Sequence, residues 1–69
     1  MIEVFKTDVQ DGETAKALVQ RLLCHFPNNR INFDLLDCDK ILRVEGECFS
    51  VQKIIELISL EGYQVKVLP

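Results

Sequence analysis

The sequence contains no tryptophan, one histidine, two prolines and three glycines, and it has no long apolar run. With 48% hydrophobic and 28% charged residues, so little proline and glycine excludes a disordered or low-complexity chain. A membrane-spanning helix needs about 20 consecutive apolar residues, which the chain lacks. Residues 1–6 are typical of a strand rather than of the basic and then apolar start of a secretory signal. We therefore expect a folded, cytoplasmic protein.

Positive charge is also in the minority. Eight Lys and Arg residues against eleven Asp and Glu residues give a net charge of −3 and an isoelectric point near 4.9. A protein that binds nucleic acid without sequence preference needs a basic surface to displace counterions from the phosphates. Acidic membrane surfaces repel a negatively charged protein for a related reason. The composition therefore disfavours nucleic-acid and membrane partners and leaves another protein as the expected one.

The length of 69 residues allows one domain, spanning residues 1–69. A chain this short buries only roughly 60% of the surface that it exposes when unfolded, so it forms one modest core. The three cysteines cannot all pair within one chain, and a reducing compartment favours three free thiols. Free cysteine mostly behaves as a small hydrophobic residue, so a structural role is the first expectation for each.

Hydrophobic periodicity predicts the order strand, helix, strand, strand, helix, strand. Asp11 and Ser50 fit the N-caps of the two helices, and Gly62 fits the end of the second. This order predicts an α+β, ferredoxin-like βαββαβ sandwich, with two helices on one face of a four-stranded antiparallel sheet. The expected elements are residues 2–8, 12–26, 31–36, 41–44, 51–60 and 63–67.

Alternation also predicts which side chains face away from the helices. We expect Phe5, Leu36 and Ile41 to lie on the exposed face of the sheet, where they would form a small apolar patch. A contiguous apolar patch favours docking or self-association, so we expect a monomer or a weak homodimer. Leu42 and Val44 are the expected core residues of the third strand. In the second helix, Ile54 and Ile58 belong to the expected buried stripe, which Leu57 and Leu60 are expected to widen.

The segment that ends the second helix and begins the last strand, residues 54–65, contains Gly62 and Tyr63 at the turn. It resembles the last helix and strand of heavy-metal-associated domains, in which a helix ends in Gly-Tyr before a short apolar strand. Length and element order match that family across nearly the whole chain. The resemblance implies the ferredoxin-like fold and a functional loop between the first strand and the first helix.

In that family the first loop carries Met-x-Cys-x-x-Cys, followed by two apolar helix positions. Aligning Leu18 and Leu22 with those positions places Val9 where the methionine would be, and Asp11 and Thr14 where the cysteines would be. Cu(I) selects soft thiolate ligands, and none of these three side chains supplies one. We therefore expect the usual soft-metal site to be missing and no cofactor to be bound.

Other families with this architecture fit less well. An RNA-recognition module needs exposed aromatic residues on its first and third strands, but the third strand here has none. An acylphosphatase needs a first loop that cradles phosphate, whereas Asp8, Asp11 and Glu13 would repel an anion. Fold alone does not decide function, so local residues must.

The topology gathers acidic residues at one end of the molecule. The first loop contributes Asp11 and Glu13, beside Asp8, and the hairpin between the second and third strands contributes Asp37 and Asp39. Glu61, after the second helix, lies at the same end. Such a group suits a hard cation or a basic protein surface, and we take Asp11, Glu13, Asp37 and Asp39 as candidate protein-binding residues. The alternative is that these side chains cap a helix, shape a turn or are simply solvated.

The same topology predicts that Cys24, His25 and Cys48 lie at the opposite end. They suggest a partial Zn(II) site, and the two sulfurs alone suggest a disulfide. Adjacent side chains on a helix diverge by about 100°, which opposes a site that uses both Cys24 and His25. In the alternative, Cys24 is buried, His25 faces solvent and Cys48 lies in a loop.

Cys38 is expected to be an exposed thiol whose thiolate is disfavoured by the flanking carboxylates Asp37 and Asp39. No base or oxyanion site accompanies it, so we do not expect an enzyme. The sequence therefore predicts a non-enzymatic binding module that acts through protein contacts. The alternative is a non-standard metal-binding or thiol redox protein that uses Cys24, Cys48 and His25.

Overall fold

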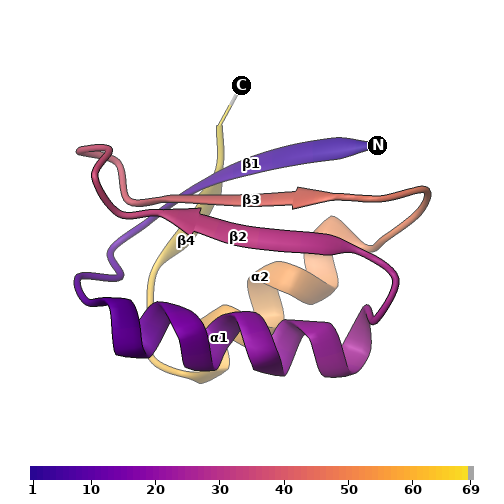
Figure 1. Cartoon of the computed structure of the whole chain (residues 1–69), viewed down its shortest axis with the longest axis horizontal. Coiled ribbons are helices and arrows are strands. Elements are labelled where there is room, and N and C mark those ends of the chain that lie inside the picture. The colour runs from indigo at the N-terminus through magenta and orange to yellow at the C-terminus, as the bar shows by residue number, and fades with distance from the viewer. Residues whose placement is uncertain (69) are drawn as a thin grey trace.

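The computed structural model describes residues 1–68 and contains one sheet covered by two helices (Figure 1). Neighbouring strands are antiparallel, in the order β2-β3-β1-β4, so the predicted ferredoxin-like βαββαβ architecture is confirmed. None of the described helices is long and apolar enough to cross a membrane. The elements are β1 (Ile2–Thr7), α1 (Gly12–His25), β2 (Arg30–Asp34), β3 (Ile41–Glu45), α2 (Val51–Leu60) and β4 (Val65–Val67).

Both helices begin at the predicted caps. The Asp11 carboxylate accepts a hydrogen bond from the Thr14 N–H at 3.2 Å, and the Ser50 hydroxyl oxygen accepts one from the Lys53 N–H at 3.1 Å. Each bond satisfies one of the backbone donors that the first turn of a helix leaves free. After α2, Gly62 has a φ of 94°, a left-handed conformation that favours glycine.

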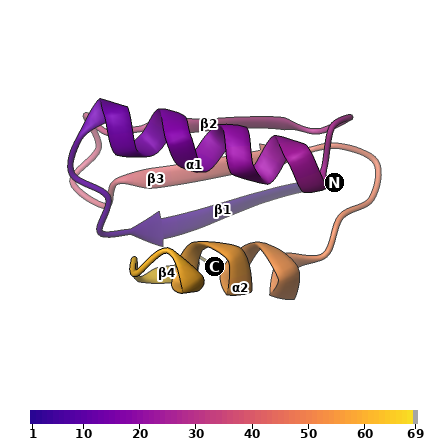
Figure 2. The same ribbon diagram turned by 90° about the horizontal axis from the view of Figure 1, so that it is seen from below.

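The core lies between the sheet and the two helices, which cover the same face (Figure 2). α1 packs beside β2, and α2 packs beside β4. The predicted core positions Leu42 and Val44 on β3 and Ile54 and Ile58 on α2 are fully buried, which confirms the periodicity of both elements. The largest fully buried side chains are Phe5, Leu22, Leu42, Ile54, Ile58, Val9 and Val44.

The predicted facing of β1 is wrong. Phe5 is 0% exposed and lies opposite Leu42 and Val67 on the helix-covered side, whereas Ile2 is 55% exposed. Because successive residues of a strand alternate between faces, placing Phe5 on the wrong face also places every other residue of β1 on the wrong face. Phe5 therefore belongs to the core, and the expected patch of Phe5, Leu36 and Ile41 does not form.

Features of β2 and α2 also differ from expectation. β2 ends at Asp34, two residues early, because the Asp34 carboxylate accepts a hydrogen bond from the Leu36 N–H at 3.2 Å and starts a turn. Leu36 consequently leaves the sheet and is 100% exposed. Leu60 is the last residue of α2 and is 81% exposed, so it does not extend the buried stripe as predicted.

The face of the sheet opposite the helices, here called the open face, is unlike the rest of the molecule in charge. Residues directly opposite one another in an antiparallel register share a face. The registers place six charged residues there: Lys6, Arg30, Arg43, Lys66, Asp34 and Glu45. Four cations and two carboxylates give +2, and since the chain carries −3, all other residues together carry −5.

Candidate functional site

The first loop and the β2–β3 hairpin are joined at one end of the molecule. The Thr7 N–H donates to the Asp39 carbonyl at 3.1 Å, and the Thr7 hydroxyl donates to the Lys40 carbonyl at 2.6 Å. Gly12, which begins α1, and Leu36 line the same groove, so the start of α1 also lies near the hairpin. We call this region the acidic end, and its carboxylates are those of Asp8, Asp11, Glu13, Asp37 and Asp39.

The positions that align with the metal ligands of heavy-metal-associated domains have other roles here. Val9 is 0% exposed and packs with Ala15 and Leu18 in the core. Asp11 is the N-cap of α1, and hydrogen bonds from the Thr14 hydroxyl and then the Thr14 N–H hold the pKa of Asp11 below its ordinary value. The loop therefore presents the buried methyl groups of Val9, the capping carboxylate of Asp11 and the hydroxyl of Thr14.

At the hairpin tip, Cys38 joins two of the carboxylates that the sequence suggested for a hard cation. The side-chain ligand atoms of Asp37, Cys38 and Asp39 lie within 4.8 Å of one another. The turn itself explains this closeness, because an Asp37 carboxylate oxygen accepts a hydrogen bond from the Asp39 N–H at 2.8 Å. Asp39 also pairs with Lys6 at 3.5 Å. Because Asp37, Cys38 and Asp39 are consecutive in the sequence, their closeness could have been predicted.

The second predicted group is only partly assembled. His25 and Cys48 line one hollow of about 570 Å³ at the end of α1, together with Asn28, Asn29 and Glu47. Cys24 does not line it, and among residues 1–68 the ligand atoms of Cys24, His25 and Cys48 do not meet within 4.8 Å. The separation agrees with the divergence of adjacent helix side chains.

All three thiols are free and exposed, including Cys24, whose alternative placement in the core is therefore wrong.

In the hollow lined by His25 and Cys48, the Asn29 Nδ2 is buried without a hydrogen-bond partner among the described residues. A Cβ at Gly46 would lie 2.5 Å from that nitrogen, so any larger residue at this position would force the Asn29 side chain to move.

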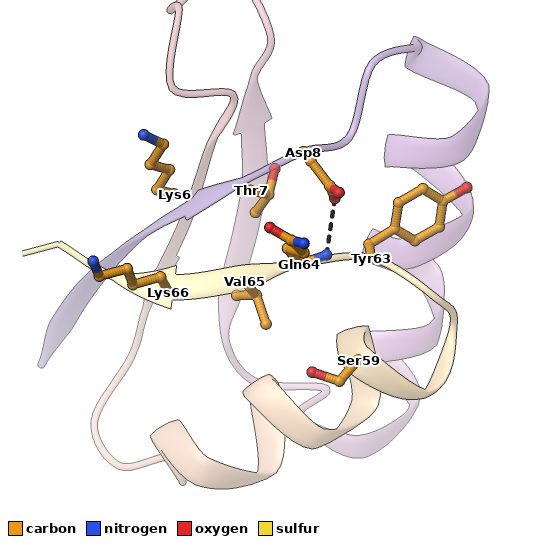
Figure 3. Close-up of a pocket in the computed structure, with 8 residues that line it drawn as sticks. All are labelled: Lys6, Thr7, Asp8, Ser59, Tyr63, Gln64, Val65 and Lys66. Carbon is orange, nitrogen blue, oxygen red and sulfur yellow. Dashed lines mark hydrogen bonds between the residues drawn. The ribbon is translucent and has the colours of Figure 1, made fainter.

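A third hollow, of about 600 Å³, lies where β1 meets β4 (Figure 3). Asp8 accepts a hydrogen bond from the Gln64 N–H at 2.8 Å and fixes the entry of the chain into β4. In Figure 3 the ammonium groups of Lys6 and Lys66 extend away from the hydroxyls of Ser59 and Tyr63. The ammonium groups of Lys6 and Lys66 therefore do not converge on one point with these hydroxyls, as a nucleophile, a base and an oxyanion site must.

The chain matches no protein-family model, no curated protein and no solved structure.

Proposed function

We propose that this protein is a non-enzymatic binding module, built like a heavy-metal-associated domain without the Cys-x-x-Cys site, whose acidic end binds another protein. One observation carries the proposal: Leu36 is 100% exposed on the hairpin that bears Asp37 and Asp39. Hydrogen bonds from Thr7 hold that hairpin against the first loop. An exposed apolar side chain beside several carboxylates complements a basic surface that contains an apolar recess.

The partner is inferred from charge. Residues outside the open face carry −5, and the acidic end accounts for five of their carboxylates. Complementary charge speeds the encounter of two proteins and disfavours partners of like charge. Leu36 supplies the apolar contact that charge alone lacks, and the preformed turn limits the conformational entropy lost on binding. A basic protein surface is therefore the partner class that this end favours.

A non-enzymatic role is supported by the placement of the reactive side chains. The single histidine, His25, lies at the end opposite Cys38. The hydroxyls of Ser59 and Tyr63 lie apart from the nearest ammonium groups (Figure 3). Acyl or phosphoryl transfer needs such groups within hydrogen-bond reach of one reacting atom.

The test is affinity capture with matched pairs of variants, followed by calorimetry with the captured protein once purified. Leu36→Ser and Glu13→Lys change the acidic end. Leu60→Ser and Glu56→Lys make the same chemical changes on exposed positions of α2. We expect the first pair to weaken binding by about tenfold or more and the α2 pair to leave it unchanged. Equal affinity of all four variants would overturn the proposal.

A second candidate function is metal or redox chemistry at the opposite end, favoured by the shared hollow of His25 and Cys48. Zn(II) accepts imidazole and thiolate ligands. An oxidant could also take two electrons and two protons from Cys24 and Cys48 to form a disulfide if their Cα atoms approach within about 7 Å. This candidate predicts Zn(II)-induced amide shifts at these residues, or a mass loss of two protons on mild oxidation. The absence of both effects dismisses it.

A further inference from the structure

β2 is an edge strand. In the sheet order β2-β3-β1-β4 it pairs with β3 on one side, and within residues 1–68 no strand pairs with its other side. Alternate residues of an edge strand direct their N–H and C=O groups away from the sheet, where they can pair with another strand. β2 therefore presents a row of backbone donors and acceptors suited to strand addition.

An apolar groove of about 670 Å³ runs between this edge and α1. Phe33 and Leu35 are only partly buried within it. A strand added to β2 would cover Phe33 with its own helix-facing residues, because side chains of paired strands share faces. Leu35 directly follows the strand. Beside Phe33 and Leu35, the apolar side chains that line the groove are Ala15, Val19, Ile31 and Leu36.

The sequence of β2 specifies what can be added. It runs Arg30-Ile31-Asn32-Phe33-Asp34, with opposite charges at its two ends and apolar residues on either side of a central asparagine. When two copies of this strand pair antiparallel about Asn32, Arg30 of each lies opposite Asp34 of the other. Ile31 then lies opposite Phe33, and the two Asn32 side chains meet at the twofold axis. Opposite-charge cross-strand pairs stabilise a sheet and like-charge pairs destabilise it.

From this complementarity we infer that the occupant of the β2 edge is a second copy of this chain. The product is a continuous eight-stranded antiparallel sheet with two α1 helices flanking the junction on one face. The interface is isologous, so it closes at a dimer rather than extending into a fibre. This inference goes beyond the proposed function, because the backbone of the β2 edge and the pair Arg30 and Asp34 determine the contact, although Leu36 lines both the groove and the acidic end.

The other surfaces of the sheet do not suit a second copy. Self-pairing of the opposite edge, β4, about its centre would place Lys66 opposite Lys66 over only three residues. Stacking two open faces would bring +2 against +2. A five-residue strand pair with a flanking groove is at the small end of specific interfaces, below roughly 1,200 Å² of total buried surface. The dimer is therefore weak and concentration-dependent.

The first experiment is sedimentation equilibrium with a charge-swap cycle, carried out on fully reduced protein so that no disulfide links two chains. Arg30→Asp and Asp34→Arg each replace two attractive pairs by two repulsive ones, so each is expected to weaken dimerisation by about tenfold or more. The double variant R30D/D34R restores opposite charges in the same register and recovers the affinity of the wild type. The control Lys66→Asp makes an equivalent change on the other edge and leaves dimerisation unchanged.

The double variant also separates pairing from folding. Asp34→Arg removes the hydrogen bond to the Leu36 N–H, but R30D/D34R loses the same bond and still regains the dimer. Where a single swap fails to fold, Asn32→Lys serves instead, since it places two lysines together at the twofold axis and changes only an exposed side chain. Thermal unfolding of dilute protein verifies the fold of each variant.

Amide hydrogen exchange supplies the second measurement. At concentrations of about 1 mM, protection is expected to rise for alternate residues of β2 relative to dilute protein, with no change in β4. Three results would each overturn the inference: a wild type that stays monomeric at about 1 mM, charge swaps that leave dimerisation intact, or a double variant that fails to recover it.

Discussion

Thr7 and Lys40 are joined by a hydrogen bond across 33 residues, with the Thr7 hydroxyl donating to the Lys40 carbonyl at 2.6 Å. The same hydroxyl oxygen accepts a hydrogen bond from the Val9 N–H at 3.3 Å, and Thr7 is only 6% exposed. One buried side chain therefore ties the end of β1 to both the first loop and the β2–β3 hairpin. Lys40 itself has a φ of 46°, which this contact helps to maintain.

Replacing Thr7 with valine is expected to lower the free energy of unfolding by about 1–3 kcal/mol, because the Lys40 carbonyl and the Val9 N–H lose their partner in a buried place. Thr7→Ser keeps the hydroxyl and is the matched control, with a smaller loss expected. Urea unfolding of the two variants provides the measurement. A Thr7→Val protein as stable as Thr7→Ser would show that the hydroxyl contributes nothing.

The facing of β1 gives a second prediction. Phe5→Ala is expected to destabilise the protein by about 3–5 kcal/mol, since it empties a fully buried site opposite Leu42. The adjacent Val4→Ala removes atoms from the partly exposed open face and is expected to cost about 1 kcal/mol or less. Thermal or urea unfolding compares the two. Equal losses would contradict the register of β1.

Asp11 makes stability depend on pH. Its folded-state pKa is lowered from the ordinary value of 3.8 by the Thr14 hydrogen bonds. The stabilisation from the ionised cap is fully present above that ordinary value and is lost as the pH falls through the lower folded-state pKa. The stability difference between wild type and Asp11→Ala should therefore shrink between about pH 5 and about pH 2.

Asp11→Asn is the control for this pH dependence, because asparagine also caps helices but does not titrate. Its stability relative to Asp11→Ala should stay constant over the same range. Unfolding midpoints measured at several pH values supply the comparison. A wild-type advantage over Asp11→Ala that does not change with pH would rule out the carboxylate as its source.

A gain-of-function test addresses the first loop. In a background where Cys24, Cys38 and Cys48 are serines, we expect no stoichiometric submicromolar Cu(I) binding, because Val9, Asp11 and Thr14 supply no thiolate. Adding Asp11→Cys and Thr14→Cys to that background is expected to create such binding if the loop has the frame of a heavy-metal-associated domain. Competition titration against a Cu(I) chelator measures both proteins.

Each outcome of the Cu(I) titration has a distinct meaning. Tight Cu(I) binding by the serine background would overturn the proposed absence of a soft-metal site at the first loop. A double-cysteine variant that folds but binds no Cu(I) would contradict the resemblance on which the positions of Asp11 and Thr14 were aligned. Loss of the Asp11 cap makes circular dichroism of that variant a necessary check of folding.

The sequence alone predicted the features that depend on local chemistry. The caps Asp11 and Ser50 could be recognised because each side chain bonds to a backbone N–H three residues ahead. Leu42 and Val44 could be assigned to the core because Arg43 lies between them and Glu45 follows them on β3. These local signals determined the element order and, through it, the fold.

The features that the sequence did not reveal depend on distant contacts. Ile2, Val4 and Phe5 are all apolar, so alternation gave a weak signal on β1 and placed Phe5 on the wrong face. The pairing of Phe5 with Leu42 determines the buried face. The sequence predicted which end of the molecule carries Cys24, His25 and Cys48. It did not predict that Cys24 lies outside the hollow lined by His25 and Cys48, because that placement depends on where α1 ends. The complementarity of Arg30 and Asp34 has meaning only because β2 lies at an edge of the sheet.

The uneven charge of the two sides has a further physical consequence. An open face at +2 and a remainder at −5, with five of its carboxylates at the acidic end, give the molecule an electric dipole whose positive side is the open face. In dilute salt this dipole turns the protein before any contact forms, since charges interact over about 30 Å at an ionic strength of about 0.01 M. A cationic body is therefore approached with the helices and loops leading, and an anionic one with the sheet leading.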